Sequence, residues 1–230
     1  MNNKRARFFR ILKIILLYIL LSQLFLIVLY KWVNPPITIT QLVNWVEGYG
    51  LKRDYVSWEE ISPNMKLAVI ASEDQTFVEH NGLDWESIKE ARKHNEKHPN
   101  RIWGASTISQ QTAKNVFLWQ HGGYFRKGLE AGYTYVIDFF WGKQRILEAY
   151  LNVIEMGPGI FGVQAAAKTY FNKNASQLTE REAAMIAACL PNPKRYTVKP
   201  LSRYVARRTE SILRQMHNIS DVEEIMKLVR

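Results

Sequence analysis

The pattern of apolar and polar residues changes sharply along this chain, and the longest apolar run lies near its start. Residues 14–30 are apolar apart from Ser22 and Gln23, and apolar flanks extend the run to residues 11–33. Since about 20 apolar residues cross the hydrocarbon core of a bilayer, the run predicts a transmembrane helix. A cleaved signal peptide is the alternative, but the run is too long and no small-x-small cleavage site follows it.

The charges on either side of this helix predict its orientation. One basic residue, Lys31, follows the run directly, whereas five lie ahead of most of it: Lys4, Arg5, Arg7, Arg10 and Lys13. Because positively charged flanks stay in the cytoplasm, residues 1–10 are expected to form a cytoplasmic tail and residues 37–230 to face outward.

The sequence Asn34-Pro35-Pro36 ends the apolar run and begins a stiff connection. The aromatic-rich residues 37–58 show no clear period, and a position along the membrane surface is a hypothesis for them. The expected domains are therefore the tail, the helix 11–33, a membrane-proximal linker 34–58 and one outer domain, 59–230.

Beyond residue 58 the pattern predicts helices. Ser62 and Pro63 are a strong start signal, as N-cap and first helical residue. A capping box at Thr179 and Glu182 opens a later helix that Pro191 closes. The expected helices cover 63–73, the first part of 85–103, 106–117, 126–152 with a break near Trp141-Gly142, 183–190 and about 201–217. No segment shows strand alternation, which predicts an all-α domain.

Composition supports a folded domain with a basic surface. Hydrophobic residues make up 47% of the 230 and aromatic residues 12%, which excludes a disordered chain. The single cysteine, Cys189, excludes an internal disulfide and lies in an apolar run, where a buried thiol is expected. Half of the net charge of +10 comes from the five basic residues near the N-terminus, and the rest fits an anionic ligand or a lipid surface.

The densest group of ionisable side chains lies between Glu73 and Asp84, directly after the apolar run 67–71. A carboxylate at the point where an apolar helix meets a loop is partly desolvated, which raises its pKa toward acid–base catalysis. Glu73 occupies that point. A solvated helix end is the simpler alternative.

Two further polar clusters follow. The stretch 104–115 places hydroxyl and carboxamide groups at a helix start and adds one cation, Lys114, which suits a sugar beside a phosphate. The alternative is a capped surface helix. Arg126, followed by Lys127, lies one turn before Glu130, and these charges either face a phosphate or form an ordinary surface ion pair.

Other chemistries lack their signatures. The five histidines show no zinc-site spacing, and the chain has no Gly-rich phosphate loop and no GxSxG elbow. A membrane span also argues against a nucleic-acid partner. Within the helix 126–152, Arg145 and Glu148 are expected on the surface.

Five motifs together carry a resemblance that none of them carries alone. They are EDQTFVEHNGLD, GASTISQQTAKN, RKGLE, KQRILEAYLN and AAKTYFNK…LTEREAAMIAACLPNP, in this order across about residues 60–200. In these motifs the chain resembles the family 51 glycosyltransferases, the peptidoglycan glycosyltransferases, in the monofunctional form that lacks a transpeptidase domain.

The resemblance implies a lysozyme-like α-helical domain that polymerises lipid II, in which a sugar 4-hydroxyl attacks C1 of the donor and displaces undecaprenyl pyrophosphate with inversion. Glu73 matches the general base. Glu130 matches a second essential carboxylate that helps to position the donor pyrophosphate, and Lys114 and Arg126 match positions that contact it. The other substrate-binding matches are Ser106, Thr107, Gln110, Gln111, Asn115 and His80.

The resemblance also implies the surroundings of the reaction. No cofactor or protein-bound metal is required, and Mg²⁺ or Mn²⁺ at the pyrophosphate is left open. The expected partners are lipid II, the growing glycan, the membrane, and proteins of cell-wall synthesis or division. The expected location is a bacterial cytoplasmic (inner) membrane, crossed once, with the catalytic domain in the periplasm.

The chain departs from the family pattern at three positions. Gly122, beside His121, replaces an arginine that is common about four residues before the RK pair, so one donor-side cation is missing from that place. Asp138 stands where many relatives have Glu, and Asn172 where Gly is common.

Two other functions fit parts of the pattern. A lytic muramidase or lytic transglycosylase would use Glu73 as an acid, and a non-enzymatic membrane-anchored scaffold for cell-wall machinery would leave both carboxylates unexplained. A hydrolase has no use for cations that bind a pyrophosphate, so Lys114 and Arg126 favour synthesis.

Overall fold

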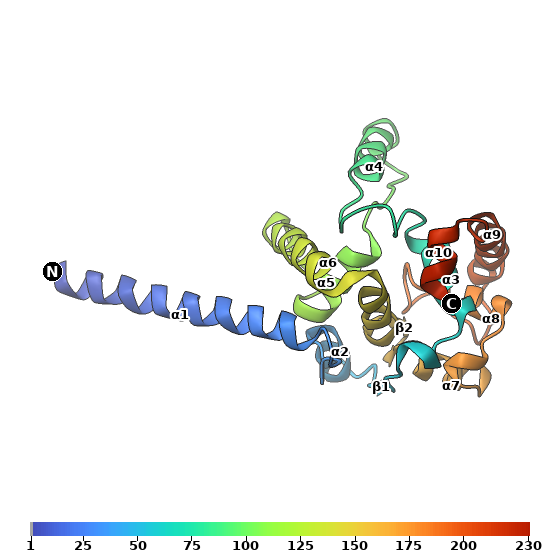
Figure 1. The fold of residues 1–230 in the computed structure, drawn as a ribbon, viewed down its shortest axis with the longest axis horizontal. Helices are drawn as coiled ribbons and strands as arrows, with labels where there is room; N and C mark the ends of the chain where they lie inside the picture. The colour runs from blue at the N-terminus through green and yellow to red at the C-terminus, as the bar shows by residue number, and fades with distance from the viewer. Residues whose placement is uncertain (1) are drawn as a thin grey trace. The chain divides into compact units, whose positions relative to one another are not determined.

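The structure is a computed structural model that describes residues 2–230, with side chains from residue 5 onward, so the side chain of Lys4 lies outside the described part. The chain divides into two units, residues 1–35 and 36–230 (Figure 1). The first contains α1 (Asn2–Leu29), which within the described residues is the helix long and apolar enough to cross a membrane. It begins inside the stretch expected as a tail and ends before residue 33, because residues 30–32 form a turn ahead of the proline pair.

The second unit is built almost entirely of helices, which confirms the predicted all-α class. Each helix expected from the pattern is present, and three further helices, at 39–46, 163–171 and 223–229, were not expected. The helices are α2 (Ile39–Val46), α3 (Pro63–Glu73), α4 (Trp85–Lys97), α5 (Ile108–Phe117), α6 (Tyr124–Val153), α7 (Val163–Phe171), α8 (Glu180–Ala187), α9 (Arg203–Ile219) and α10 (Glu223–Val229), with short 3-10 helices at Trp58–Glu60 and Ala175–Gln177.

The expectation that the domain has no strands was wrong in detail. A small sheet has the order β1-β3-β2, with β1 (Lys52–Arg53) parallel to β3 (Ile160–Phe161) and β2 (Glu155–Gly157) antiparallel to it. Strands of two or three residues are too short to show an apolar–polar alternation, so the sequence carried no signal for them.

The core forms around α3, which packs against α8, α9 and α10, while α5 packs along α6 (Figure 1). The predicted cap is confirmed, since Ser62 Oγ accepts a hydrogen bond from the backbone N–H of Met65 at 3.1 Å, with Pro63 as the first helical residue. Residues 68–71 are buried. Glu73, the last residue of α3, therefore lies where the helix leaves the core.

Two helix boundaries show how local signals act. The predicted break in α6 is confirmed at Gly142, whose φ of 76° and ψ of 165° are not helical. The predicted capping box of Thr179 and Glu182 opens α8. That helix ends at Ala187, earlier than expected, because turns lead from there to Pro191.

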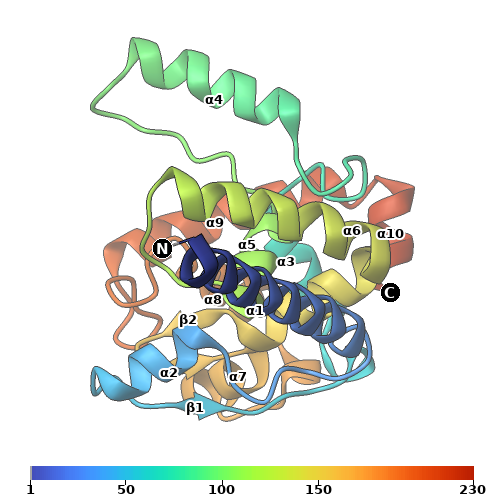
Figure 2. The same cartoon turned by 90° about the vertical axis from the view of Figure 1, so that its left-hand side faces the viewer.

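The helix α4 and the loop after it project from the rest of the second unit in both views (Figure 2). Asp84 caps this helix by accepting a hydrogen bond from the backbone N–H of Ser87 at 2.9 Å. The loop returns to the body of the domain at the start of α5, which brings Ser106 and Thr107 close to the end of α3.

Candidate active site

Glu73 is held by a chain of hydrogen bonds from two other helices. The amide nitrogen Nε2 of Gln111, on α5, donates to Oε2 of Glu73 at 2.9 Å. The hydroxyl of Tyr150, on α6, donates to Oε1 of Gln111 at 3.2 Å. Because Tyr150 is fully buried, it fixes the Gln111 amide with its NH₂ group toward the carboxylate.

Burial raises the pKa of Glu73, and the negative charge of Asp74 raises it further. The hydrogen bond from Gln111 and the positive charges of Arg208 and Lys114 oppose that rise. The sequence predicted no role for Arg208, because this residue lies far along the chain from Glu73, on α9. In the structure its Nη2 donates to the backbone oxygen of Ser72 at 3.3 Å. No local sequence signal connects α9 with the end of α3.

A cluster of positive charges surrounds Glu130 and includes Lys114, whose charge also acts on Glu73. Nη1 of Arg126 donates to Oε2 of Glu130 at 2.6 Å, and Nζ of Lys127 donates to the other carboxylate oxygen. Burial lowers the pKa of Lys114, which interacts electrostatically with Glu130, Arg126, Lys127 and Glu73. Three cations thus share Glu130, leaving an excess of positive charge.

The alternative of an ordinary surface ion pair is wrong for Arg126 and Glu130. The side chains of Arg126 and Glu130 are 12% and 3% exposed. Ions this well buried are held by their partners and are only weakly screened by solvent. A ligand anion that reaches the cluster meets a fixed positive field.

Two cavities lie near the Glu73–Gln111 hydrogen bond, one lined by each partner. The larger, about 510 Å³, is lined by Gln111, Lys114 and Asn115 together with residues of α2. The smaller, about 360 Å³, is lined by Glu73, Ser106 and other residues of the α3 and α5 ends. The hydrogen bond between Gln111, in the lining of the larger cavity, and Glu73, in the lining of the smaller, connects the two linings.

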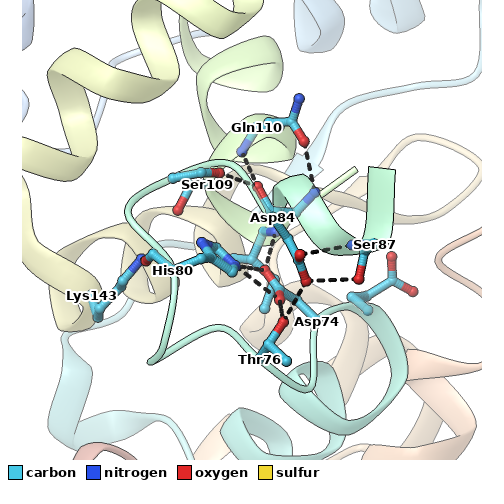
Figure 3. A network of polar contacts seen from close by, with 12 residues as sticks. Asp74, Thr76, His80, Asp84, Ser87, Ser109, Gln110 and Lys143 are labelled. Atoms are coloured by element: carbon cyan, nitrogen blue, oxygen red, sulfur yellow. Dashed lines mark hydrogen bonds and ion pairs between the residues drawn. The ribbon is translucent and has the colours of Figure 1, made fainter. Parts of the chain in front are cut away.

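Asp74 and His80 support the end of α3 (Figure 3). A carboxylate oxygen of Asp74 accepts from the backbone N–H of Ile108 at 2.9 Å, and the same side chain faces Nε2 of His80 at 3.0 Å. Lys143 donates to the backbone oxygen of His80 at 2.6 Å and to Asp138 at 2.8 Å. The network ties α3, α5 and α6 together around the candidate base.

The other predicted substrate residues divide into two groups. Gln111 and Asn115 line the larger cavity, and Ser106 and Thr107 the smaller. Gln110 instead is buried, with its Oε1 accepting from the backbone N–H of Thr107, and it lines neither cavity. His80 likewise lines neither. Both side chains contact other protein groups, Gln110 the backbone of Thr107 and His80 the carboxylate of Asp74.

Arg145 and Glu148 correct another expectation. They were expected on the surface, but they form an ion pair at 3.2 Å with side chains 11% and 18% exposed. The helical period shows which residues share a face, whereas the packing of neighbouring elements decides whether that face is covered.

The three departures from the family pattern have structural explanations. A side chain at Gly122 in this conformation would place its Cβ 2.8 Å from Cβ of Arg126, so Arg126 occupies the space beside it. Asp138 accepts hydrogen bonds from Ser109 and Lys143. Asn172 ends α7 with φ 56° and ψ 39°, the left-handed conformation that Asn tolerates better than most other residues.

The charge cluster does not suit a protein-bound divalent cation. Both oxygens of Glu130 already accept from Arg126 and Lys127, and Lys114 adds a third positive charge. Within residues 2–230 no group of three His, Cys, Asp or Glu side chains could hold a metal ion. The donor set fits an anion.

Comparisons with known proteins identify relatives of this chain. The transglycosylase family model matches residues 40–217. The chain is similar to a biosynthetic peptidoglycan transglycosylase of Aeromonas hydrophila, with 47% identity over 212 residues that cover 90% of each chain. Proteins with the same name from Shigella boydii serotype 4 and Escherichia coli are each 56% identical over 182 residues, which cover 78% of this chain and 75% of theirs.

Proposed function

The chain belongs to the transglycosylase family, and from that premise we propose that this peptidoglycan transglycosylase polymerises lipid II into glycan strands. The observation that carries the proposal is a half-buried carboxylate, Glu73, that interacts electrostatically with Lys114, which belongs to a partly buried cluster of cations. A base and an anion-binding site side by side suit the attack of a hydroxyl on a sugar that carries a pyrophosphate.

In the proposed reaction Glu73 removes the proton from the 4-hydroxyl of the acceptor sugar. The oxygen forms a bond to C1 of the donor sugar while the bond from C1 to the pyrophosphate oxygen breaks, and the leaving undecaprenyl pyrophosphate takes that electron pair. A single displacement of this kind inverts the configuration at C1. The raised pKa of Glu73 makes its carboxylate a better proton acceptor than an exposed one.

The leaving group is stabilised by Lys114, Arg126 and Lys127 in this proposal. Glu130 holds Arg126 and Lys127 in place and keeps the cluster from carrying three uncompensated charges. Cations fixed in advance at the point where negative charge develops lower the barrier without reorganisation. No step is assigned to a divalent cation, because the residues present do not fit one.

A lytic enzyme that cleaves finished peptidoglycan is the second candidate. The raised pKa of Glu73 suits a general acid as well as a base, so this side chain does not separate the two functions. The cation cluster does, since hydrolysis of a neutral glycan releases no pyrophosphate. A scaffold without activity would need neither feature.

The deciding experiment incubates the purified full-length protein with lipid II and separates the products by size. We expect long glycan strands from the native protein, none from Glu73→Gln, and native amounts from Glu79→Gln, a change at an exposed carboxylate of the same segment. Cleavage of finished peptidoglycan without any polymer from lipid II would exclude the synthase.

We further propose that α1 anchors the protein in a bacterial cytoplasmic membrane, with the N-terminus in the cytoplasm and the domain in the periplasm. The length and apolar composition of α1 and the basic residues at its start support this orientation. Proteins of cell-wall synthesis or division stay predicted partners.

A further inference from the structure

The larger cavity beside Lys114 contains a second group of polar side chains that the proposed reaction does not use. We call this group the Glu155 region, and its members are Asn44, Glu47, Glu155 and Lys194. The cavity volume of about 510 Å³ lies within the range of about 300–1,000 Å³ that is usual for ligand sites. A cavity of this size has room for more than one group of a ligand.

Asn44 leaves a buried oxygen without a hydrogen-bond partner. The residue is 3% exposed, and its Nδ2 donates to the backbone oxygen of Thr40 at 3.1 Å. That bond fixes the side chain and leaves Oδ1 as its free acceptor. Within the described part of the chain no group donates to this Oδ1. Because buried polar atoms almost always have a partner, the oxygen indicates a donor that the chain itself does not supply.

Glu155 adds a carboxylate that is largely shielded from water. It is 9% exposed, and its Oε1 accepts from the backbone N–H of Gly159 at 3.2 Å. Burial raises the pKa of Glu155, and the negative charge of Glu47 also raises it. Hydrogen bonds from Gly159 and Asn44 and the positive charge of Lys194 oppose that rise. A further cation beside this carboxylate would offset the cost of its burial.

The Glu155 region has more negative than positive charge. Nζ of Lys194 lies 3.4 Å from Oε2 of Glu47 and 3.8 Å from the centre of the Tyr49 ring. Glu47 and Glu155 therefore share one ammonium group, and with both carboxylates ionised one negative charge is in excess. The charges that act on Lys114 come from other residues. One cavity is thus lined by a positive region and by a separate negative one.

We propose that the Glu155 region binds a primary ammonium group of the ligand whose pyrophosphate binds at Lys114. An ammonium group supplies three hydrogen-bond donors and one positive charge. It therefore satisfies Oδ1 of Asn44 and compensates the carboxylate of Glu155 with the same atom, through charge-assisted hydrogen bonds. This inference rests on the proposed function, because it concerns the substrate of the same cavity.

The proposed substrate can carry both groups. Lipid II joins a pyrophosphate to a sugar that bears a short peptide, and a side chain of that peptide can end in an amine. Three extended residues span about 10 Å, so the amine and the pyrophosphate can occupy different parts of one cavity. The Glu155 region would then select precursors by the amine of their peptide.

The test compares two forms of lipid II, one with a free side-chain amine in its peptide and one in which that amine is acetylated. Binding to the full chain in one detergent is measured by titration calorimetry, with Glu73→Gln present to prevent turnover. We expect the acetylated form to bind about tenfold more weakly, because it lacks the charged donor. Adding Glu155→Gln, which keeps an acceptor for Gly159, should weaken binding of the free amine by the same factor and leave the acetylated form unchanged.

Two further variants complete the comparison. Glu47→Gln removes a charge from an exposed side chain of the region and should reduce the preference for the free amine about twofold. Glu224→Gln, at an exposed carboxylate of α10, should leave both affinities as they are. The thermal unfolding midpoint shows whether each variant is folded, and Glu47→Gln decides the question if Glu155→Gln does not fold.

Equal affinities for the two forms would overturn the inference, and so would a preference that the changes at Glu155 and Glu47 leave intact. Polymerisation of lipid II by the native protein is measured separately. Absence of polymer with the preference intact contradicts the proposed function alone. Polymer formation with equal affinities contradicts only the role of the Glu155 region.

Discussion

At the scale of single residues, the burial of Glu73 should make its ionised side chain destabilise the folded protein. Its pKa is raised in the folded protein, above about 4.3 in the unfolded chain. Between those two values the folded state binds more protons, so the free energy of unfolding falls as the pH rises through that window and stays lower above it. The cost is absent below the unfolded value, where the carboxyl is protonated in both states.

Glu73→Gln should therefore raise the thermal unfolding midpoint at pH 7.5 and leave it nearly unchanged at pH 4, while abolishing activity. The measurement is thermal unfolding of the full chain in one detergent at both pH values. Glu79→Gln, at an exposed side chain, should change neither midpoint. A native protein that is more stable than Glu73→Gln at pH 7.5 would show that ionised Glu73 stabilises the fold.

Lys114 should matter for the reaction far more than for the fold. Burial lowers its pKa, so the folded protein disfavours its charge. We expect Lys114→Ala to reduce polymerisation about a hundredfold, the usual loss when one group that stabilises a developing anion is removed. The unfolding midpoint should not fall. Lys168→Ala, at an exposed ion pair with Asp54, is the control for activity, and an equal drop in stability for both variants would argue for a structural Lys114.

The candidate site shows which functional residues the sequence pattern predicts and which it does not. The sequence identified Glu73, Lys114, Arg126 and Glu130, and the structure brings these four together. It gave no signal for the hydroxyl of Tyr150 or for Arg208, because their contacts with the site depend on helices packed from distant parts of the chain. The family resemblance implied ligand contacts for Gln110 and His80, whereas the Gln110 side chain bonds the backbone of Thr107 and the His80 ring faces Asp74.

At the scale of elements, Gly142 introduces a kink into the long helix α6. Its φ of 76° and ψ of 165° are accessible to glycine and strained for other residues, although no atom would contact an added Cβ. The first half of α6 carries Arg126 and Glu130 and the second half carries Tyr150. The bend therefore helps to align the cation cluster with the hydrogen-bond chain to Glu73.

Gly142→Ala should destabilise the protein by about 2 kcal/mol through backbone strain. Gly132→Ala, in the exposed helical interior of α6, should instead stabilise it by about 0.5–1 kcal/mol. Denaturant unfolding of both variants in one detergent gives the comparison. Equal effects of the two changes would show that position 142 can adopt a helical backbone at no cost.

At the scale of the whole molecule, the orientation of α1 is the main prediction. In a Cys189→Ser background, single cysteines at Asn3 and Asn218 are treated in intact cells with a thiol reagent that crosses the outer but not the inner membrane. We expect labelling at position 218 at once and at position 3 only after the inner membrane is permeabilised, because the basic flank stays in the cytoplasm. The reverse pattern would invert the proposed topology.

The sequence by itself determined the apolar helix, the positions of most other helices and the family motifs, but not α2, α7 and α10. These features depend on neighbours a few residues apart: an apolar run, a 3.6-residue period, an N-cap such as Ser62, or the breaks at Gly142 and Pro191.

Only the tertiary structure decided which faces of the helices are covered by other segments of the chain. Glu130 is buried, the Arg145 side chain is only 11% exposed, and the polar face of α2 is turned inward while its apolar face is left exposed. Burial depends on which distant segments pack together, and so do the pKa shift of Glu73 and the field of the cation cluster. A period along one helix carries no information about the element that lies against it.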